Sequence, residues 1–352
     1  MRTILSFLKC ICVTTLLCQP VAVMAAVTGS DEHSESGQET STVYKARLAQ
    51  NTPHQYAPTD AGSGKESEHD SSAAGQALSI DEIAIELSNP VGSMIIIDNE
   101  FQYRGYQGSL ADASDESAFI YQLQPTFPFP LDNGKNILLR FRIPINGTQP
   151  IYEADEEYSP FLIRQIASTI PTDGTFDNEH GHSHLADIGF DIAYGGVSDN
   201  GFISMFGIAG KLPTSQDFSQ SVDQIRLGPE IAFGKVTDWG IYGAWATHLV
   251  RLSGEDAWDT NMTSIKIFFA YGLRNGWQII SNPNIEYDWE GDKKNKLFLP
   301  IGAGVAKTMK LGRVPLRLSF EIQYYIESPD SIGPEWLMTL GVRPAFANPL
   351  LR

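Results

Sequence analysis

The chain has 352 residues, of which 42% are apolar and 11% aromatic, and its formal net charge at pH 7 is −17. Beyond residue 26 the longest unbroken apolar stretches, such as 267–271, span about a third or less of the ~20 residues that a membrane helix needs. Acids outnumber bases by 42 to 25, and no cluster of Lys and Arg is present. The composition therefore excludes a polytopic helical membrane protein and argues against nucleic-acid binding.

The N-terminus has the three-part layout of a secretory signal peptide. Arg2 and Lys9 precede the apolar run 10–17, and a stretch of small residues follows at 23–26. The run is too short for a membrane anchor, so we expect residues 1–26 to be a signal peptide of an exported protein.

Cleavage is expected near Ala25 or Ala26, which removes all three cysteines, Cys10, Cys12 and Cys18. Acylation of Cys18 is a less favoured alternative, because Leu residues rather than a small residue precede it. Cleavage removes two of the 25 bases and none of the acids, so the exported chain has a net charge of −19.

Residues 27–78 are rich in Ser, Thr, Glu, Asp, His, Gly and Ala and have almost no large apolar side chains. Such a segment cannot bury enough surface to offset its ordering entropy, so a disordered acidic tail is expected. A short amphipathic helix follows over 79–90. Ser79 and Glu82 form a capping-box pattern, and Asn89-Pro90 ends the helical spacing. We expect this helix to pack on the remaining chain as a plug or strut; a partner-binding helix is the alternative.

From about residue 93 onward the hydrophobic period becomes two. Residues 314–327 alternate most clearly, with apolar side chains such as Leu318 and Ile322 on one face and polar ones such as Glu321 on the other. The same signal predicts twelve strands, which begin near residues 93, 118, 136, 184, 201, 223, 239, 261, 276, 296, 313 and 334.

Short and long connections alternate along the chain. Short turns such as Asn133-Gly134 and Asn275-Gly276 suit tight hairpins. Longer polar loops lie between them, at about 105–117, 147–183, 213–222, 252–261, 290–296 and 328–334. An even number of long strands with this alternation favours an all-β fold, an antiparallel transmembrane β-barrel over 91–348, rather than a secreted β-sandwich.

Tryptophans support this interpretation in part. Trp239, Trp277, Trp289 and Trp336 lie near predicted strand ends, where amphipathic rings favour the membrane interface. Trp245 and Trp258 do not fit that pattern, and they are left without a predicted role.

The sequence resembles a bacterial outer-membrane family named for transport in phenol degradation and often labelled neuromedin U. The matching pieces lie between about residues 84 and 346: Leu87-Ser88-Asn89-Pro90, Leu123-Gln124-Pro125, Leu227-Gly228-Pro229-Glu230, Gly276-Trp277, Asp288-Trp289 and 300–307. The resemblance implies an outer-membrane barrel that transports small molecules. The acidic tail and the ending at Arg352 depart from the family, and Phe346 is the best candidate for the terminal aromatic residue of the assembly signal.

If the apolar positions face lipid, the alternate polar positions line the lumen. The predicted set is Asp98, Glu100, Arg104, Gln122, Gln124, Arg140, Arg142, Asp187, Asp191, Arg226, Glu230, Lys266, Glu286, Asp288, Arg317, Glu321, Gln323 and Arg343. Both signs are present, so two interpretations are open: a lumen cross-braced by ion pairs, or a polar conduit with little charge selectivity. With twelve strands, the barrel is intermediate in size between barrels of ~8 strands, which side chains fill, and barrels of ~16–18 strands, which leave an aqueous channel.

Catalytic and metal-binding signals are weak. His180, His182 and His184 alternate in the longest loop and could hold a transition metal, although adventitious binding is the favoured interpretation. His248 is a possible general base, but no serine or carboxylate partner can be assigned to it. We therefore predict no enzyme, no cofactor and no dedicated metal site.

The predicted function is an outer-membrane channel for small solutes, hydrophobic or aromatic ones included, that works by passive diffusion. The alternative is a non-conducting structural or interaction barrel that presents its outer loops, and a surface enzyme ranks third. The expected partners are outer-membrane lipid, a small-molecule solute and the barrel-assembly machinery during biogenesis.

Overall fold

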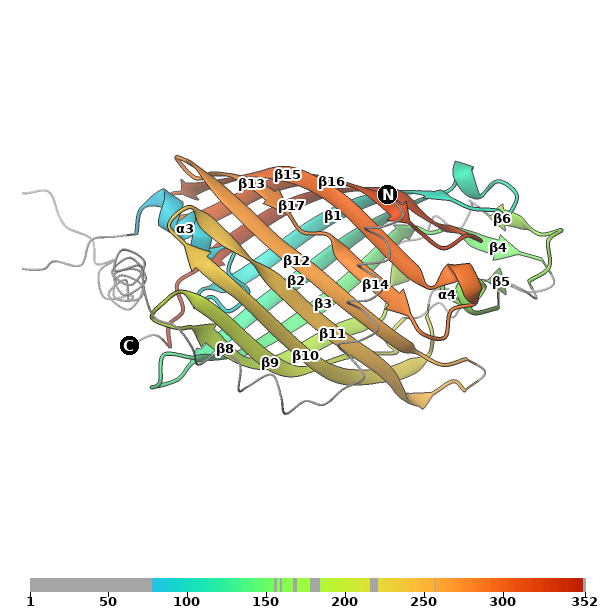
Figure 1. The fold of residues 1–352 in the computed structure, drawn as a ribbon, viewed down its shortest axis with the longest axis horizontal. Coiled ribbons are helices and arrows are strands. Elements are labelled where there is room, and N and C mark those ends of the chain that lie inside the picture. Colours follow the sequence, from blue (N-terminus) through green and yellow to red (C-terminus); the bar gives the residue numbers. More distant parts are fainter. Residues whose placement is uncertain are drawn as a thin grey trace, which may run out of the picture. The chain divides into compact units, whose positions relative to one another are not determined.

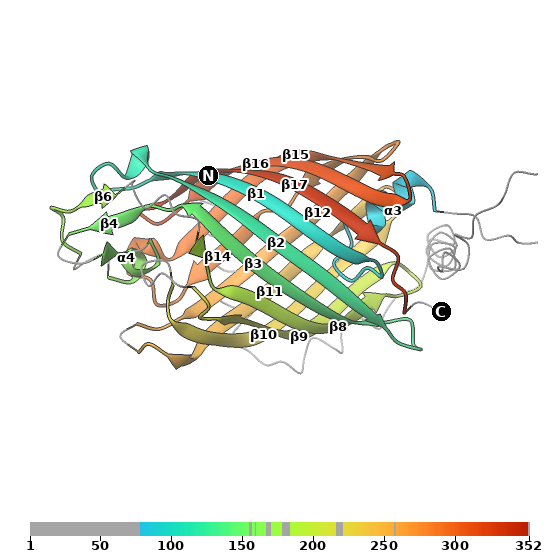
Figure 2. The ribbon, with the colours of Figure 1, turned by 180° about the vertical axis from the view of Figure 1, so that it is seen from behind.

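A computed structural model describes residues 78–154, 157–158, 160–166, 170–177, 184–215, 221–256 and 258–350 of the protein. Twelve antiparallel strands in this part of the chain form a closed barrel, which confirms the predicted fold class (Figure 1). The first strand, β1 (Ile95–Gln107), pairs with the last, β17 (Gly333–Phe346), and this seam closes the sheet on itself (Figure 2). The predicted signal peptide and nearly all of the predicted tail lie outside the described residues.

The remaining wall strands follow in chain order, and each pairs with its sequence neighbours. They are β2 (Ser117–Pro130), β3 (Asn136–Thr148), β8 (Ile188–Val197), β9 (Phe202–Leu212), β10 (Gln224–Thr237), β11 (Gly240–Gly254), β12 (Asn261–Arg274), β13 (Trp277–Ser281) with β14 (Asn284–Asp288), β15 (Leu297–Leu311) and β16 (Val314–Glu327).

Two strands that the sequence predicted as continuous are interrupted. β13 and β14 together occupy one position in the wall, because both pair with β12 and β15. Pro283 separates them; it has no backbone N–H for the ladder, although its carbonyl still accepts a hydrogen bond from the backbone N–H of Ile267 at 2.9 Å. A second break at 186–187 separates β8 from β7 (His184–Leu185), and both pair with β3.

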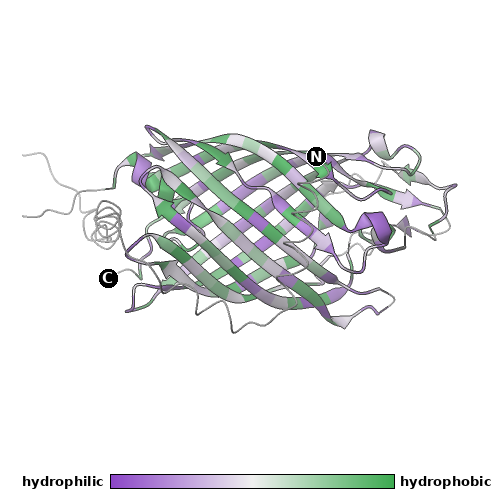
Figure 3. Cartoon of the chain, viewed as in Figure 1, coloured by the Kyte–Doolittle hydropathy of each residue, from purple (hydrophilic) through white to green (hydrophobic). Residues whose placement is uncertain are grey.

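The strands place apolar side chains outside and polar ones inside. On β16, Phe320 and Ile322 are 41% and 47% exposed, whereas Glu321 and Gln323 are 6% and 7% exposed. Because successive side chains on a strand point to opposite faces, the period of two in the sequence becomes an inside and an outside. Figure 3 shows the hydrophobic and hydrophilic residues interspersed along the wall strands.

Short turns join the strands at one end of the barrel. They follow β2, β8, β10, β12 and β15, and the glycines Gly134, Gly201 and Gly276 adopt positive φ values of 71°, 81° and 76° there. A side chain at such a position is strained, which explains why glycine ends these Asn-Gly and Asp-Asn-Gly sequences. We call this end the turn end, and the opposite one the loop end.

The longest loop at the loop end is structured, in contrast to the polar loop that the sequence predicted. It contains a three-stranded sheet of β4 (Ile151–Glu153), β5 (Glu157–Tyr158) and β6 (Thr175–Asp177), and a helix, α4 (Pro160–Ile166). Tyr152 and Ile163 of this loop are fully buried and share a hydrophobic cluster with Tyr106, Ala118 and Ile332 from the barrel rim. Two 3-10 turns lie in other outer loops: η2 (Ala113–Asp115) between β1 and β2, and η4 (Lys293–Asn295) between β14 and β15.

Aromatic rings gather near both ends of the barrel wall. At the turn end Trp239 stacks on Tyr242, with ring centroids 5.7 Å apart, and also contacts Tyr271. Near the loop end Tyr287 contacts Trp289 at 4.7 Å and Tyr103 contacts Trp336 at 5.3 Å. Two such belts are typical of barrels that span a bilayer.

The helix predicted before the first strand is α3 (Ile80–Glu86), and it has the complete capping box. The Ser79 hydroxyl accepts from the Glu82 backbone N–H at 3.2 Å, and the Glu82 carboxylate accepts from the Ser79 N–H at 2.8 Å. None of the helices in the described part of the chain is long and apolar enough to cross a membrane. α3 lies at the turn end, where the Asp81 carboxylate accepts a hydrogen bond from the Gly276 N–H at 2.5 Å.

Candidate functional site in the barrel lumen

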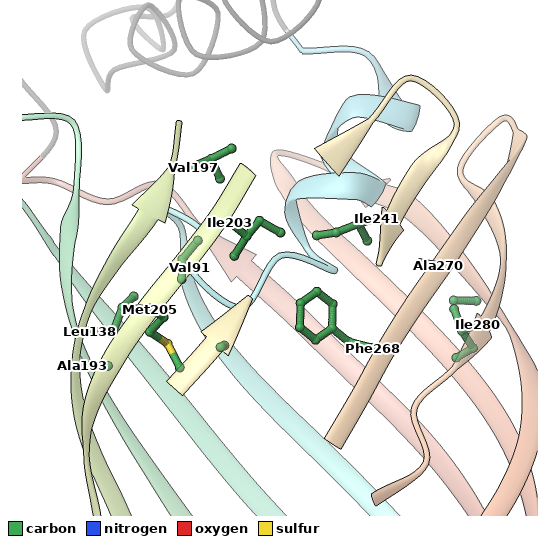
Figure 4. Close-up of a cluster of buried hydrophobic side chains, with 12 residues drawn as sticks. Val91, Leu138, Ala193, Val197, Ile203, Met205, Ile241, Phe268, Ala270 and Ile280 are labelled. Carbon is green, nitrogen blue, oxygen red and sulfur yellow. The ribbon is translucent and has the colours of Figure 1, made fainter. Parts of the chain in front are cut away.

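The segment that links α3 to β1 enters the barrel at the turn end. Val91, only 2% exposed, lies among inward-facing apolar side chains from many wall strands (Figure 4). They are Leu138, Ala193, Val197, Ile203, Met205, Ala232, Ile241, Phe268, Ala270, Ile280 and Ala306. We call residues 87–92 the lumen segment, and this cluster packs around its tip.

Three arginines of the barrel wall hold the backbone of the lumen segment. The Leu87 carbonyl accepts from Arg343 Nη1 at 2.6 Å and from Arg317 Nη1 at 3.3 Å. The Pro90 carbonyl accepts from Arg140 Nη1 at 3.0 Å. These carbonyls follow the last turn of a short helix and lack strand partners, so charged donors in the lumen satisfy groups that would be costly to bury unpaired.

Further polar contacts fix the segment. Asn136 Nδ2 donates to the Val91 carbonyl at 3.1 Å. The Glu86 carboxylate, on a residue only 1% exposed, accepts from the Ser93 N–H at 2.7 Å and from the Ser93 hydroxyl at 3.0 Å. The sequence had predicted a plug or strut at this helix, and the structure places the following segment, rather than the helix itself, inside the barrel.

A buried ionic cluster surrounds Trp245 in the middle of the lumen. Arg140 Nε lies 2.7 Å from an Asp191 carboxylate oxygen, and Arg140 Nη2 lies 3.4 Å from Glu230. The Arg140 guanidinium stacks over the Trp245 ring at 4.0 Å, and the Trp245 indole N–H donates to Glu230 at 3.0 Å. Charges removed from water need such partners, so this part of the lumen is cross-braced.

The opposite wall has its own pairings. Arg343 forms an ion pair with Asp98. Glu321 accepts from the backbone N–H and the side-chain amide of Asn282, at 2.7 Å and 2.8 Å. The break between β13 and β14 exposes this backbone N–H, so the interruption of the wall is compensated by a lumen carboxylate.

A cavity of about 740 Å³ occupies the lumen between these features. It extends from Leu87 and Asn89 of the lumen segment to Ile151 and Phe161 of the longest outer loop. The predicted lumen residues that line it are Asp98, Glu100, Arg104, Gln122, Gln124, Arg140, Arg142, Asp187, Arg226, Lys266, Glu286, Arg317, Glu321, Gln323 and Arg343.

Three residues of the predicted set do not line the cavity. Asp191 and Glu230 are 0% and 3% exposed and lie behind it, in the ion pairs with Arg140. Asp288 is 1% exposed and accepts from the backbone N–H groups of Glu290 and Gly291, so it stabilises the loop after β14.

Trp245 and Lys211 are among the cavity-lining residues that the sequence prediction missed. Trp245 was left without a role because tryptophan was expected at strand ends. A signal for Lys211 on β9 was present in the sequence, since Phe206 and Ile208 occupy even-numbered positions and an odd-numbered position then faces inward; both are exposed in the structure, at 60% and 54%.

The histidines have simple surroundings. His184 is paired across the strands with Asn146, whereas His180 and His182 lie outside the described residues. His248 Nδ1 lies 2.8 Å from the Thr263 hydroxyl. Within the described residues no three His, Cys, Asp or Glu side chains are grouped so that they could hold a metal ion.

No family model and no curated protein matches the sequence. Among solved structures, the chain is similar to the COG4313 outer membrane channel from Pseudomonas putida F1, with a TM-score of 0.51, 9% identity, and coverage of 73% of this chain and 96% of that one. The NanC porin has a TM-score of 0.39 and 11% identity, with coverage of 70% of this chain and 98% of that one. The outer membrane phospholipase A from Escherichia coli has a TM-score of 0.36 and 11% identity, with coverage of 77% of this chain and 98% of that one. The first likeness shows that the protein shares the fold of outer-membrane barrels.

Proposed function

We propose that the protein is an outer-membrane channel through which small molecules, hydrophobic or aromatic ones included, pass by passive diffusion. The observation that carries this proposal is the cavity, because it reaches from the outer loop to the lumen segment inside a closed barrel. A wall braced by ion pairs alone would not require a hollow of this size. The similar fold of a known outer membrane channel supports the proposal.

In this proposal the lumen segment sets the constriction. Its tip packs in an apolar cluster of the lumen, and its carbonyls are held by arginine side chains rather than by strand ladders. The segment can exchange its hydrogen bonds with arginine side chains one at a time. A strand that left its ladder would instead break the barrel wall. The segment can therefore shift while the barrel stays closed.

The test is conductance and flux of the purified full-length protein. Planar bilayers give the single-channel current in KCl, and liposome swelling with uncharged solutes of increasing size gives the size limit. We expect discrete current steps and faster entry of small solutes than of large ones. A protein that inserts correctly but carries neither current nor solute would refute the channel and favour the alternative, a structural or interaction barrel.

We also propose that outer-membrane lipid surrounds the wall between the two aromatic belts and that the barrel-assembly machinery inserts it. Correct insertion has an independent readout, since closed barrels resist unfolding in detergent and migrate differently in a gel before and after boiling. Identical migration, together with recovery in the soluble periplasmic fraction, would contradict the membrane placement.

A further inference from the structure

A row of basic side chains crosses the inner wall towards the loop end. Lys211 on β9 is the direct cross-strand partner of Arg226 on β10, and Gly189 on β8 pairs with Lys211 on one side and with Arg142 on β3 on the other. Arg142, Lys211 and Arg226 all line the cavity. We call these three cations, with Gly189 between them, the basic row.

The row places like charges opposite each other. Side chains directly opposite in an antiparallel pair have Cβ atoms ~4.5–5.5 Å apart, and like charges at that separation destabilise the sheet. The pairing of Lys211 with Arg226 is therefore an arrangement that the fold alone does not favour. A bound anion would offset the repulsion.

The carboxylates near the row already have partners. Glu286, which lines the same cavity and attracts Lys211, accepts from the Asn284 side-chain amide at 2.8 Å. Asp187 accepts from Arg226 Nη2 at 2.6 Å, from the Ser221 hydroxyl at 2.9 Å and from the Ser215 N–H at 3.4 Å. Asp191 is shared between Arg140 at 2.7 Å and Arg142 at 3.5 Å.

Lys211, in contrast, has no ion pair or hydrogen bond with the described residues. In the same part of the structure, the buried Nε of Arg226 has no acceptor. Lys211 therefore remains available as a cationic donor at the cavity surface, among the described residues.

Gly189 lets Arg142 and Lys211 lie close to each other along the cavity wall. The glycine is itself buried, and a Cβ at this position would lie 3.5 Å from the Arg142 Cβ and 3.9 Å from the Lys211 Cγ. Ile151, Val222 and Leu249 line the same cavity. A charged head group at the row can thus have an apolar body beside it.

We propose that the basic row binds the carboxylate of a small amphiphilic anion within the lumen. This inference rests on the proposed channel function, because it assigns a solute class to that lumen. The carboxylate accepts hydrogen bonds from the Lys211 ammonium, beside the guanidinium groups of Arg142 and Arg226, and the apolar part of the solute contacts the side chains from the outer loops and β11.

The test is block of the KCl current by hexanoate, with hexan-1-ol as an uncharged solute of the same length. We expect saturable block by hexanoate and a much weaker effect of hexan-1-ol. Lys211→Gln should raise the half-blocking hexanoate concentration about tenfold, the effect of losing one charge-assisted hydrogen bond.

Gly189→Val places a branched side chain between Arg142 and Lys211 without changing any charge, and we expect it to weaken block while the reversal potential in a KCl gradient stays the same. Lys266→Gln is the matched control, since it removes the same charge from the same lumen on β12, outside the row; it should shift the half-blocking concentration less than twofold. Gel migration before and after boiling checks that each variant is folded.

An equal shift in Lys211→Gln and Lys266→Gln, or no shift in Lys211→Gln, would overturn the basic row as a binding site. Calorimetric titration of hexanoate into the detergent-solubilised barrel separates the two proposals. Saturable binding that depends on Lys211, in a protein without conductance, would refute the channel but keep the site. Conductance without saturable binding would refute the site but keep the channel.

Discussion

The substitution Val91→Ser tests whether the lumen segment closes the channel. Val91 is 2% exposed, packs in the apolar cluster of the lumen and lies outside every wall strand, so changing it removes no strand pairing. Removing a fully buried valine side chain costs about 2 kcal/mol, and a hydroxyl without a partner in an apolar cluster adds about 1 kcal/mol. The docked state would lose about 3 kcal/mol, which is roughly a hundredfold in its equilibrium with an undocked state.

The assay is single-channel recording of the variant beside the wild type. The undocked state of the lumen segment should give a higher conductance than the docked state. We expect this higher level to be occupied roughly a hundredfold more often in the variant, until it dominates the record. Val314→Ser is the matched control, because Val314 is a half-buried valine at the turn end that lies outside the lumen. Its record should match that of the wild type.

Hydrogen exchange distinguishes the possible failures of this reasoning. Amides of residues 87–92 should exchange faster in Val91→Ser than in the wild type, because the segment leaves the lumen more often. Faster exchange with an unchanged current would mean that the segment moves without controlling passage. That result would refute the segment as the constriction.

Three further predictions concern stability: two that of the barrel and one that of the helix α3. Arg343→Gln leaves the Asp98 carboxylate without its guanidinium and the Leu87 carbonyl with only that of Arg317, and should cost about 3–5 kcal/mol in urea unfolding from vesicles; adding Asp98→Asn should restore part of that loss. Ile322→Arg, in the middle of the lipid-facing side of β16, should cost ~2–4 kcal/mol in the same assay, but Ile326→Arg near the strand end only ~0–1 kcal/mol; equal costs would contradict the membrane placement. Ser79→Ala removes the helix cap and should destabilise α3 by about 1 kcal/mol, seen as faster amide exchange over 80–86 with an unchanged unfolding midpoint of the barrel.

The barrel was predictable because its signals are local. The alternation of Phe320, Glu321 and Ile322 assigns each side chain to a face without any knowledge of the partner strands, and Asn275-Gly276 marks a tight turn by its own backbone preference. Even the inward position of Lys211, which was missed, follows from the alternation of its strand, because it occupies an odd-numbered position and the apolar Phe206 and Ile208 occupy even-numbered ones.

The features that shape the lumen were not predictable in this way. The Leu87 carbonyl meets Arg317 and Arg343, which are 230 and 256 residues away in the sequence, and no local pattern encodes that contact. Folding of the longest outer loop likewise depends on residues distant in the sequence, Tyr106 on β1 and Ile332 just before β17, which share a cluster with Tyr152. The loop's polar composition suggested an irregular structure. The hydrophobic cluster that orders the loop is shared with the barrel rim, so it forms only when residues distant in the sequence come together.

The anchoring of Leu87 has a consequence for the order of assembly. Its two arginine donors lie on β16 and β17, the last strands of the chain, although the segment itself precedes β1. The apolar pocket of Val91 also needs strands from β3 to β15. Closing contacts over such separations is entropically slow, so a partly folded barrel has no binding place for this segment. We therefore expect the lumen segment to dock late in folding, once every strand is in place.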